Sequence, residues 1–161
     1  MSNPTGLTHV NERGEPQMID VSAKAETQRW ALAEARLCMQ ASTLDLIMQG
    51  GMSKGDVLTV ARLAGIQAAK KTSDLIPLCH PLALTSIDVE IDEDRELPGL
   101  HLQARCGLVG RTGVEMEALT AVTLAALTVY DMCKAVDRSM HMVYVGLVEK
   151  QGGQRGPWRR S

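Results

Sequence analysis

The sequence contains very few aromatic residues. Among 161 residues there is no Phe, and there are only two Trp and two Tyr. A core built on stacked aromatic rings is therefore excluded, and Leu, Val, Ile, Ala and Met must supply the buried apolar surface. A chain of this length is expected to form one domain with room for a hydrophobic core.

A basic excess and paired cysteines are also missing. Seventeen Lys and Arg residues against nineteen Asp and Glu residues give a net charge of −2, which argues against a dedicated nucleic-acid-binding protein. The four cysteines, Cys38, Cys79, Cys106 and Cys133, show no C-x-x-C spacing. Neither a zinc knuckle nor a redox-active pair is indicated, and a reducing cytoplasm is the expected location.

Both ends of the sequence are polar. Residues 1–16, MSNPTGLTHVNERGEP, lack the apolar core of a signal peptide and are expected to form a flexible leader. Residues 151–161 are expected to form a flexible basic tail. Because no repeat or linker interrupts the chain between them, residues 17–150 are predicted to form a single domain.

The sequence patterns at the start of this domain predict two strands and a short helix. Residues 17–24 have a short apolar centre that is compatible with a strand, and residues 31–39 also favour a strand. Residues 42–51 are predicted to form a short helix, with Ser42 as its N-cap and a Gly-Gly pair as its stop.

A firmer helix is predicted over residues 53–71, where apolar residues recur at helical spacing. Ser53 and Asp56 match the S-x-x-D pattern of a helix start. If Ser53 is the N-cap, Lys54 lies in the first turn, where a cation opposes the helix dipole. A solvated surface lysine is the commoner explanation, but the unfavourable position favours a role for Lys54 in binding an anionic ligand.

The second half of the domain alternates strands with one long helix. Residues 84–92 alternate apolar and acidic side chains, which predicts a half-buried strand. Residues 100–110 and 141–149 are also predicted to be strands. Helices packed on one face of a mainly antiparallel sheet give an α+β fold.

The long helix is predicted over residues 112–136, with Thr112 and Glu115 as a capping box. It is apolar nearly all round, so it should be deeply buried. Its uncharged run, residues 118–130, is shorter than the ~20 residues that a membrane span needs.

Charged residues on this helix lie only at its ends. Glu115 and Glu117 stand at the start, and Asp131 and Lys134 stand near the finish. Asp131 and Lys134 are three residues apart and can pair on one face. An ordinary intrahelical ion pair explains this spacing as well as a function does, although such pairs also occur where acid–base residues have tuned pKa values.

The stretch LIPLCHPLALT places a Cys and a His side by side between prolines. A metal site lacks companion ligands, because the other histidines lie in the predicted leader and on predicted strands. A Cys79–His80 nucleophile pair is disfavoured, because Pro81 biases His80 toward extended chain and neighbours on extended chain point to opposite sides. A stiff pocket wall is the favoured interpretation, and a purely structural histidine stays the alternative.

Three longer stretches carry a resemblance to a known family. KGDV, ARLAGIQAAKKTSDLIPLCHPL and TGVEMEALTAVTLAALTVYDMCKAV closely resemble the cyclic pyranopterin monophosphate synthases, the protein C family of molybdenum-cofactor biosynthesis. The resemblance runs from MIDVSAKAET to KQGG, which is nearly the whole chain.

The resemblance implies a ferredoxin-like α+β fold in a homohexamer, a trimer of dimers with the active site at the dimer interface. The implied activity is that of a lyase that converts a cyclised dihydro-GTP to cyclic pyranopterin monophosphate with release of diphosphate. No redox cofactor and no dedicated metal are implied; Mg²⁺ is expected only with the triphosphate of the substrate. Neither a nucleic acid nor a membrane is an expected partner.

The same resemblance assigns roles by motif. The implied catalytic residues are Asp131, Lys54 and Lys134. The implied substrate-binding residues are Leu78, Cys79, His80, Glu115, Met116 and Glu117. Lys24, Arg29 and Lys70 are weaker candidates for phosphate contacts.

Two positions depart from the family pattern. Arg111 stands where the family usually has Lys, which keeps the charge but changes its geometry. The C-terminal loop reads KQGGQRG instead of K-S-G-G-K-S-G, so the basic residue is displaced to Arg155.

A non-catalytic purine-nucleotide-binding module is the alternative function. A metal-storage protein is disfavoured because the ligand spacing is missing. Helix geometry also bears on where the site lies: Glu117 and Asp131 are fourteen residues apart, which is roughly 21 Å along a continuous helix. One alternative is that only one end is catalytic and Glu117 is structural. If both ends serve one reaction, the start of one helix must meet the end of another chain's helix.

Overall fold

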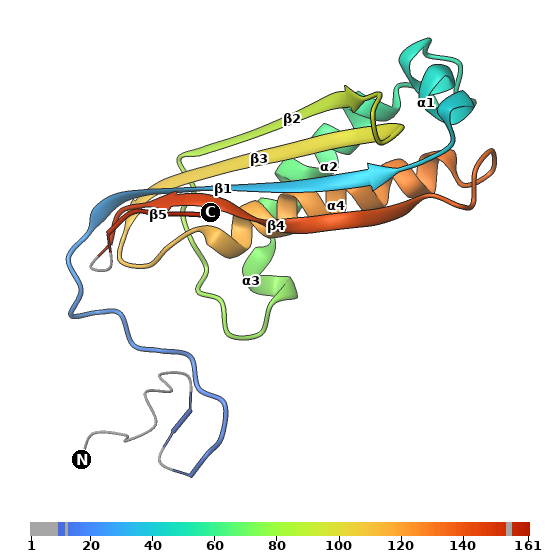
Figure 1. Cartoon of the computed structure of the whole chain (residues 1–161). Coiled ribbons are helices and arrows are strands. Elements are labelled where there is room, and N and C mark those ends of the chain that lie inside the picture. The colour runs from blue at the N-terminus through green and yellow to red at the C-terminus, as the bar shows by residue number, and fades with distance from the viewer. Residues whose placement is uncertain (1–9, 12, 154–155) are drawn as a thin grey trace.

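The computed structural model describes residues 10–11, 13–153 and 156–161. Within this part of the chain the elements are β1 (Thr27–Cys38), α1 (Ala41–Met48), α2 (Val57–Lys70), α3 (Thr72–Leu75), β2 (Ser86–Asp94), β3 (Gly99–Gly110), α4 (Glu115–Cys133), β4 (His141–Gln151) and β5 (Trp158–Arg159). The described strands form one antiparallel sheet in the order β2-β3-β1-β4-β5 (Figure 1).

The long helices α2 and α4 lie on one face of this sheet (Figure 1). The α+β class predicted from the sequence is therefore confirmed. The finer ferredoxin-like assignment stays a prediction, although β-α-β-β-α-β, with α1 to α3 taken together, is the element order of such folds.

Small side chains let α4 lie close to the central strand. Along β1 the inward positions Ala31, Ala33, Ala35 and Leu37 are fully buried, while their neighbours point to the other face. This alternation follows from the period of two in a pleated strand. Alanine leaves little bulk between strand and helix, so the centre of the core is filled largely by α4 itself.

Helix α2 crosses α4 at Gly65. A Cβ atom at this position would lie 3.0 Å from the Ala121 carbonyl oxygen and 3.3 Å from the Ala125 Cβ. Glycine therefore permits a backbone approach that any other residue would widen. The crossing fixes the start of α2 relative to the end of α4.

Helix α4 has 19 residues and contains an 18-residue window with a mean hydropathy of 1.3, which meets the length and composition of a membrane span. In the structure, however, 56% of this window is buried inside the protein. The core helix of a globular protein meets the same criteria, and the packing of α4 is of that kind.

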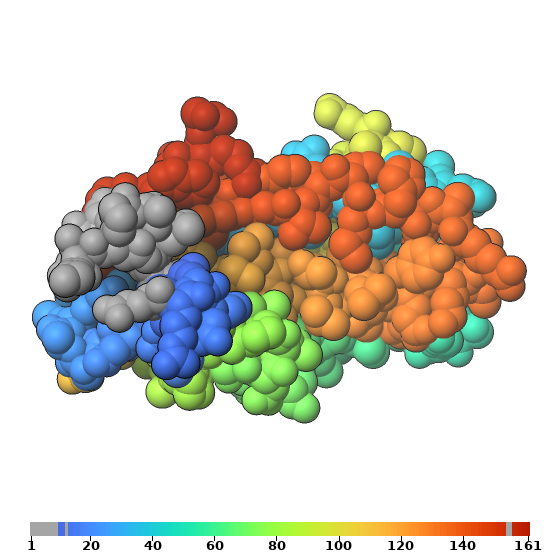
Figure 2. All heavy atoms as spheres, turned by 90° about the horizontal axis from the view of Figure 1, so that it is seen from below, coloured from blue at the N-terminus to red at the C-terminus, as the bar shows by residue number. Residues whose placement is uncertain are grey.

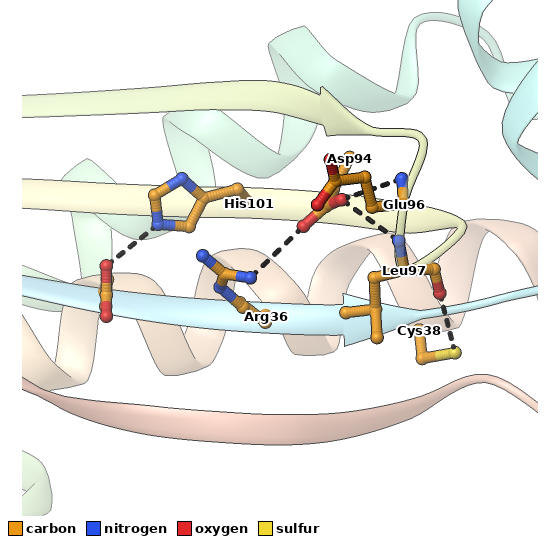
Figure 3. Close-up of polar contacts among 7 residues, drawn as sticks. Arg36, Cys38, Asp94, Glu96, Leu97 and His101 are labelled. Carbon is orange, nitrogen blue, oxygen red and sulfur yellow. Dashed lines mark hydrogen bonds and ion pairs between the residues drawn. The ribbon is translucent and has the colours of Figure 1, made fainter.

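The sheet face opposite the helices is polar (Figure 3). Arg36 pairs with Asp94 at 3.4 Å, and His101 Nε2 lies 2.9 Å from Glu34 Oε2. Asp94 also accepts hydrogen bonds from two backbone N–H groups of the turn into β3. Polar and charged side chains of this kind are typical of a sheet face that is not part of the core.

Most predicted elements are confirmed, but residues 17–24 do not form a strand. The Ser22 N–H donates to the Asp20 carboxylate at 2.8 Å, and the Lys24 N–H donates to the Val21 carbonyl oxygen at 3.0 Å. These local bonds fold the segment into a turn and replace the ladder bonds that a strand would make.

The predicted helix starts are wrong at Ser42, at Ser53 and at the Thr112–Glu115 capping box. The N-cap positions are Gln40, Asp56 and Val114 for α1, α2 and α4 respectively. Asp56 accepts the Thr59 N–H at 3.0 Å, so the acid of the S-x-x-D pattern is itself the cap. In the described residues, Gln40 and Val114 make no side-chain capping bond.

The predicted leader and the predicted tail are described in part. Residues 1–9 and 12 of the predicted leader lie outside the described residues, and so do residues 154–155 of the predicted tail. The strand β5, which the sequence did not indicate, pairs Trp158 with Lys150 of β4.

Candidate active site

The segment with Cys79 and His80, which lies between two prolines, packs against the N-terminal residues around Ile19 (Figure 2). His80 Nε2 is 2.8 Å from the Ile19 carbonyl oxygen. Because a carbonyl oxygen only accepts hydrogen bonds, Nε2 must carry the hydrogen. In the neutral ring, Nδ1 is then the nitrogen with the free lone pair.

A cavity of about 330 Å³ opens beside this contact. It is lined by Ile19, Val21, Lys24, Leu78, Cys79, His80, Leu82, Thr112, Gly113, Glu115, Met116 and Glu117. The structure thus brings together all six predicted substrate-binding residues, from the segment after α3 and from the first turn of α4. The wall predicted from the Cys-His stretch is one side of this cavity.

Glu117 is a buried acid in this wall, only 4% exposed. Burial raises its pKa to about 7, and the nearby Glu115 carboxylate adds to the rise, while a backbone hydrogen bond opposes it. Burial and, secondarily, the charge of Glu117 also raise the pKa of the Cys79 thiol. A thiol with a raised pKa is a poor nucleophile, so the geometry gives no support to a Cys79–His80 nucleophile pair.

Glu115 has a partner that the sequence did not indicate. Lys150 Nζ of β4 donates to Glu115 Oε1 at 2.7 Å. The carboxylate therefore pairs across the fold and does not act in the predicted capping box. Gly113 permits this, because a Cβ atom there would collide with the Glu115 carboxylate.

The residues that line the cavity form one cluster of candidate residues, and a second cluster, Lys54, Asp131 and Lys134, lies at the other end of α4. Lys134 Nζ donates to Asp131 Oδ1 at 2.6 Å, and Lys54 Nζ donates to Asp131 Oδ2 at 3.0 Å. The Asp131 carboxylate thus has an ammonium group on each oxygen. Hydrogen bonds from Lys134 and then Lys54 lower the pKa of Asp131, and the same contact raises the pKa of Lys134.

The position of Lys54 differs from the sequence prediction. It lies in the loop before Asp56, outside the first turn of α2, so the argument from an opposing dipole was wrong. Lys54 Nζ also donates to the Asp131 backbone carbonyl oxygen at 2.9 Å. This carbonyl belongs to the last turn of α4, where unsatisfied carbonyl groups and the helix dipole favour a cation.

Comparison with known proteins identifies the family. A family model described as the MoaC family matches residues 18–153. The chain belongs to the MoaC family.

Curated relatives from Brucella ovis, Brucella melitensis and Brucella abortus are each named cyclic pyranopterin monophosphate synthase. Each is 56% identical over 155 residues, which cover 96% of this chain and 94% of the relative. The match of this MoaC chain therefore spans both clusters and the segments that connect them.

The weaker phosphate candidates of the MoaC chain are spread over its surface. Lys24 lines the cavity, whereas Lys70 is exposed at the end of α2. Arg29 Nε donates to the Gly110 carbonyl oxygen at 3.0 Å. Arg111 lines an adjoining cavity of about 410 Å³, which also touches His80. Arg155 lies outside the described residues.

The two clusters are not brought together within one MoaC chain. The cavity is lined by the first turn of α4, while Asp131 and Lys134 lie at its last turn and just beyond, roughly 21 Å away along the helix.

Among the residues described, no group of three His, Cys, Asp or Glu side chains is placed to hold a metal ion.

Proposed function

We propose that this MoaC-family chain is a cyclic pyranopterin monophosphate synthase of molybdenum-cofactor biosynthesis. It converts a cyclised dihydro-GTP to cyclic pyranopterin monophosphate and releases diphosphate, which is a lyase reaction. The observation that carries the proposal is the 56% identity to relatives of that name over 96% of the chain. The cavity lined by all six substrate-binding candidates supports it.

The reaction requires proton transfers and the positioning of phosphates, and both clusters have groups for these tasks. Lys54, Asp131 and Lys134 are the proposed catalytic residues. Asp131 is held ionised by Lys134 and Lys54, and its carboxylate holds both ammonium groups at one place. The lysines supply positive charge for phosphate groups and protons for a developing anion.

The cavity wall supplies complementary groups. Glu117, whose pKa is raised to about 7, can both give and take a proton near neutral pH. The Nε2–H of His80 is already bound to the Ile19 carbonyl oxygen, which fixes the orientation of the ring. Leu78, Cys79, Glu115 and Met116 are proposed to contact the purine-derived ring and the ribose.

The active site is proposed to form between two chains in a homohexamer, a trimer of dimers. The distance along α4 supports this, because the reacting atoms of one ring system cannot span roughly 21 Å. Apolar residues on the flank of α4 are exposed in the single chain: Leu127 is 49% exposed and Met116 is 37% exposed. This flank lies open beside β4 (Figure 2) and suits contact with a second copy.

The proposed reaction needs no redox cofactor. Mg²⁺ is proposed to enter only with the triphosphate of the substrate. The protein is proposed to act in the cytoplasm, without nucleic-acid or membrane partners.

The test is product formation by the purified protein. The cyclised substrate is supplied and both diphosphate and the pyranopterin product are measured over time, with the Asp131→Asn variant as control. Stoichiometric release of both products by the wild-type protein, lost in the variant, is the expected result. Tight substrate binding with no product would instead support the alternative, a purine-nucleotide-binding module.

A further inference from the structure

Asp137 is a buried carboxylate outside both clusters. It is 1% exposed and lies just beyond α4, three residues after Lys134. Its Oδ2 accepts the Gln40 N–H at 2.9 Å and the Thr43 hydroxyl at 3.2 Å. Its Oδ1 accepts the N–H and the hydroxyl of Ser139 at 2.9 and 2.6 Å. A buried charge with four hydrogen bonds is fixed in place.

The bonds to Gln40 and Thr43 hold the start of α1. In the described residues, the Gln40 side chain makes no capping bond of its own. From 97 residues away in the sequence, Asp137 accepts the N–H of this N-cap residue, the group that an acid at the third helical position binds in a capping box. Its negative charge at the start of a helix is also favoured by the helix dipole.

The same helix leads to Lys54. After α1 the chain turns through Gly50 and Gly55, both with positive φ, and Lys54 reaches back to the end of α4. The segment from Gln40 to Lys54 is thus tied to the end of α4 at two points: at its start by Asp137 and at its finish by Asp131. The first tie is buried, whereas the second is half-exposed and weak by itself.

We propose that Asp137 is a positioning residue for the lysine–aspartate cluster. By clamping the start of α1 to the end of α4, it places the loop that carries Lys54, so that the Lys54 ammonium group lies on Asp131. The consequence for turnover rests on the proposed function, but the positioning itself does not depend on the substrate.

The pKa of Asp131 distinguishes a positioning role of Asp137 from a role in stability alone. Lys54 contributes to the lowering of this pKa, so displacement of Lys54 must raise it. Removal of the Asp137 charge would by itself act in the opposite direction, because the loss of a nearby negative charge lowers the pKa of a carboxyl group. A rise in the Asp131 pKa upon neutralisation of Asp137 therefore reports movement of Lys54.

The experiment follows the Asp131 carboxyl carbon by NMR titration of full-length protein labelled at aspartate carboxyl carbons, with Asp131→Asn for assignment. The Lys54→Met variant gives the pKa without the Lys54 contact. Asp137→Asn is expected to move the pKa most of the way to that value. Val122→Ala, a buried substitution at mid-α4, is the control for general destabilisation and should leave the Asp131 pKa unchanged.

An unchanged or lowered Asp131 pKa in folded Asp137→Asn would overturn the proposal. If that variant does not fold, the Asp131 pKa is measured in Thr43→Val instead. This variant keeps the Asp137 carboxylate and removes one of its two bonds to α1. A smaller rise is expected there, and no rise would equally overturn the proposal.

Turnover gives the second measurement. With cyclised dihydro-GTP as substrate, Asp137→Asn should lower kcat about tenfold with little change in KM, relative to Val122→Ala. If the wild-type protein makes no product at all, the proposed function fails, while the Asp131 titration still decides whether Asp137 positions Lys54.

Discussion

The two ends of α4 each carry an acid with a perturbed pKa, but in opposite directions. At the start, Glu117 is 4% exposed and its pKa is raised to about 7 because burial penalises its charge. At the finish, the Asp131 side chain is 56% exposed and its pKa is lowered because Lys134 and Lys54 bind its two oxygens.

The difference shows how one helix can carry two carboxyl groups with different pKa values. Burial without a cation raises the pKa of a carboxyl group, and cations without burial lower it. The two groups cannot meet on one substrate inside a single chain, because the helix between them is continuous. The comparison therefore leads directly to the proposed contact between two chains.

The largest effect on activity is expected from removing a charge at the exposed end of α4, where Lys54 contacts Asp131. Lys54→Met should lower kcat at least about 100-fold, since it removes a charged group from the proposed proton-transfer cluster. The melting temperature should change little, because half-exposed ion pairs contribute weakly to stability. Product formation and thermal unfolding are measured together. Lys71→Met, an exposed lysine beyond α2, is the matched control, and near-normal kcat in Lys54→Met would remove Lys54 from the mechanism.

A mixing experiment tests whether the two ends meet between chains. Glu117→Ala and Lys134→Ala should each be inactive alone. When they are unfolded and refolded together in equal amounts, half of the dimers are hybrids with one intact site. Activity should then return to about a quarter of the wild-type value.

Hybrid formation is verified by mass tags on the two variants, and refolded wild-type protein gives the reference activity. No recovery at any mixing ratio, with hybrids present, would show that each site is confined to one chain.

The pH dependence of stability should differ in sign between the two ends. The folded-state pKa of Glu117 is raised above its ordinary value of 4.5, so between pH 4.5 and about 7 the native state binds more protons than the unfolded state. Stability should therefore fall as pH rises through this window, relative to Glu117→Gln, by about 1 to 3 kcal/mol.

For Asp131 the pKa is lowered from 3.8, so its contribution is present above that pH and is lost as pH falls. Urea unfolding at several pH values, at fixed protein concentration, is compared for wild type, Glu117→Gln and Asp131→Asn. Parallel curves for wild type and Glu117→Gln would contradict the raised pKa of Glu117.

A smaller effect is expected from the hydrogen bond between His80 and Ile19. Gln places an amide N–H near the position of Nε2, whereas Asn places it near Nδ1. His80→Gln should therefore keep the cavity wall and the wild-type KM, while His80→Asn should raise KM about tenfold, or about 1.4 kcal/mol. Steady-state kinetics of both variants distinguish the two cases, and equal KM values would show that the contact to Ile19 does not shape the site.

The sequence patterns located most elements because these depend on local periodicity. Alternation of Ile87, Val89 and Ile91 with acidic residues marked β2, and the long apolar run marked α4. The helix starts were less predictable. Ser53 matches a start pattern, yet Asp56 makes the capping bond, because any Ser, Thr or Asp near a helix start competes for the same N–H groups.

Only part of the candidate site could be predicted from the sequence. Motifs in the sequence pointed to His80, Glu117 and Asp131, but they gave no sign of Lys150 as the partner of Glu115 or of Asp137 as the partner of the Gln40 N–H. These partners lie 35 and 97 residues apart in the sequence, and no local pattern encodes such pairs. Their identity depends on which strand lies beside α4 and on where the chain turns after it.

The sequence by itself determined the apolar patterns, and through them the α+β class, while its longer motifs carried the resemblance to the family. Tertiary structure decided the chemical state of the acids. Glu117 and Asp131 are both carboxylic acids near the ends of one helix. Lys134, three residues after Asp131, is a local cause of its lowered pKa, but the local sequence does not by itself bury Glu117 or bring Lys54 to Asp131. The packing of the cavity wall removes water from Glu117, and the loop before α2 brings Lys54 to Asp131 across 77 residues of sequence. A pKa depends on solvent and charges within a few ångströms, and only the folded chain places them there.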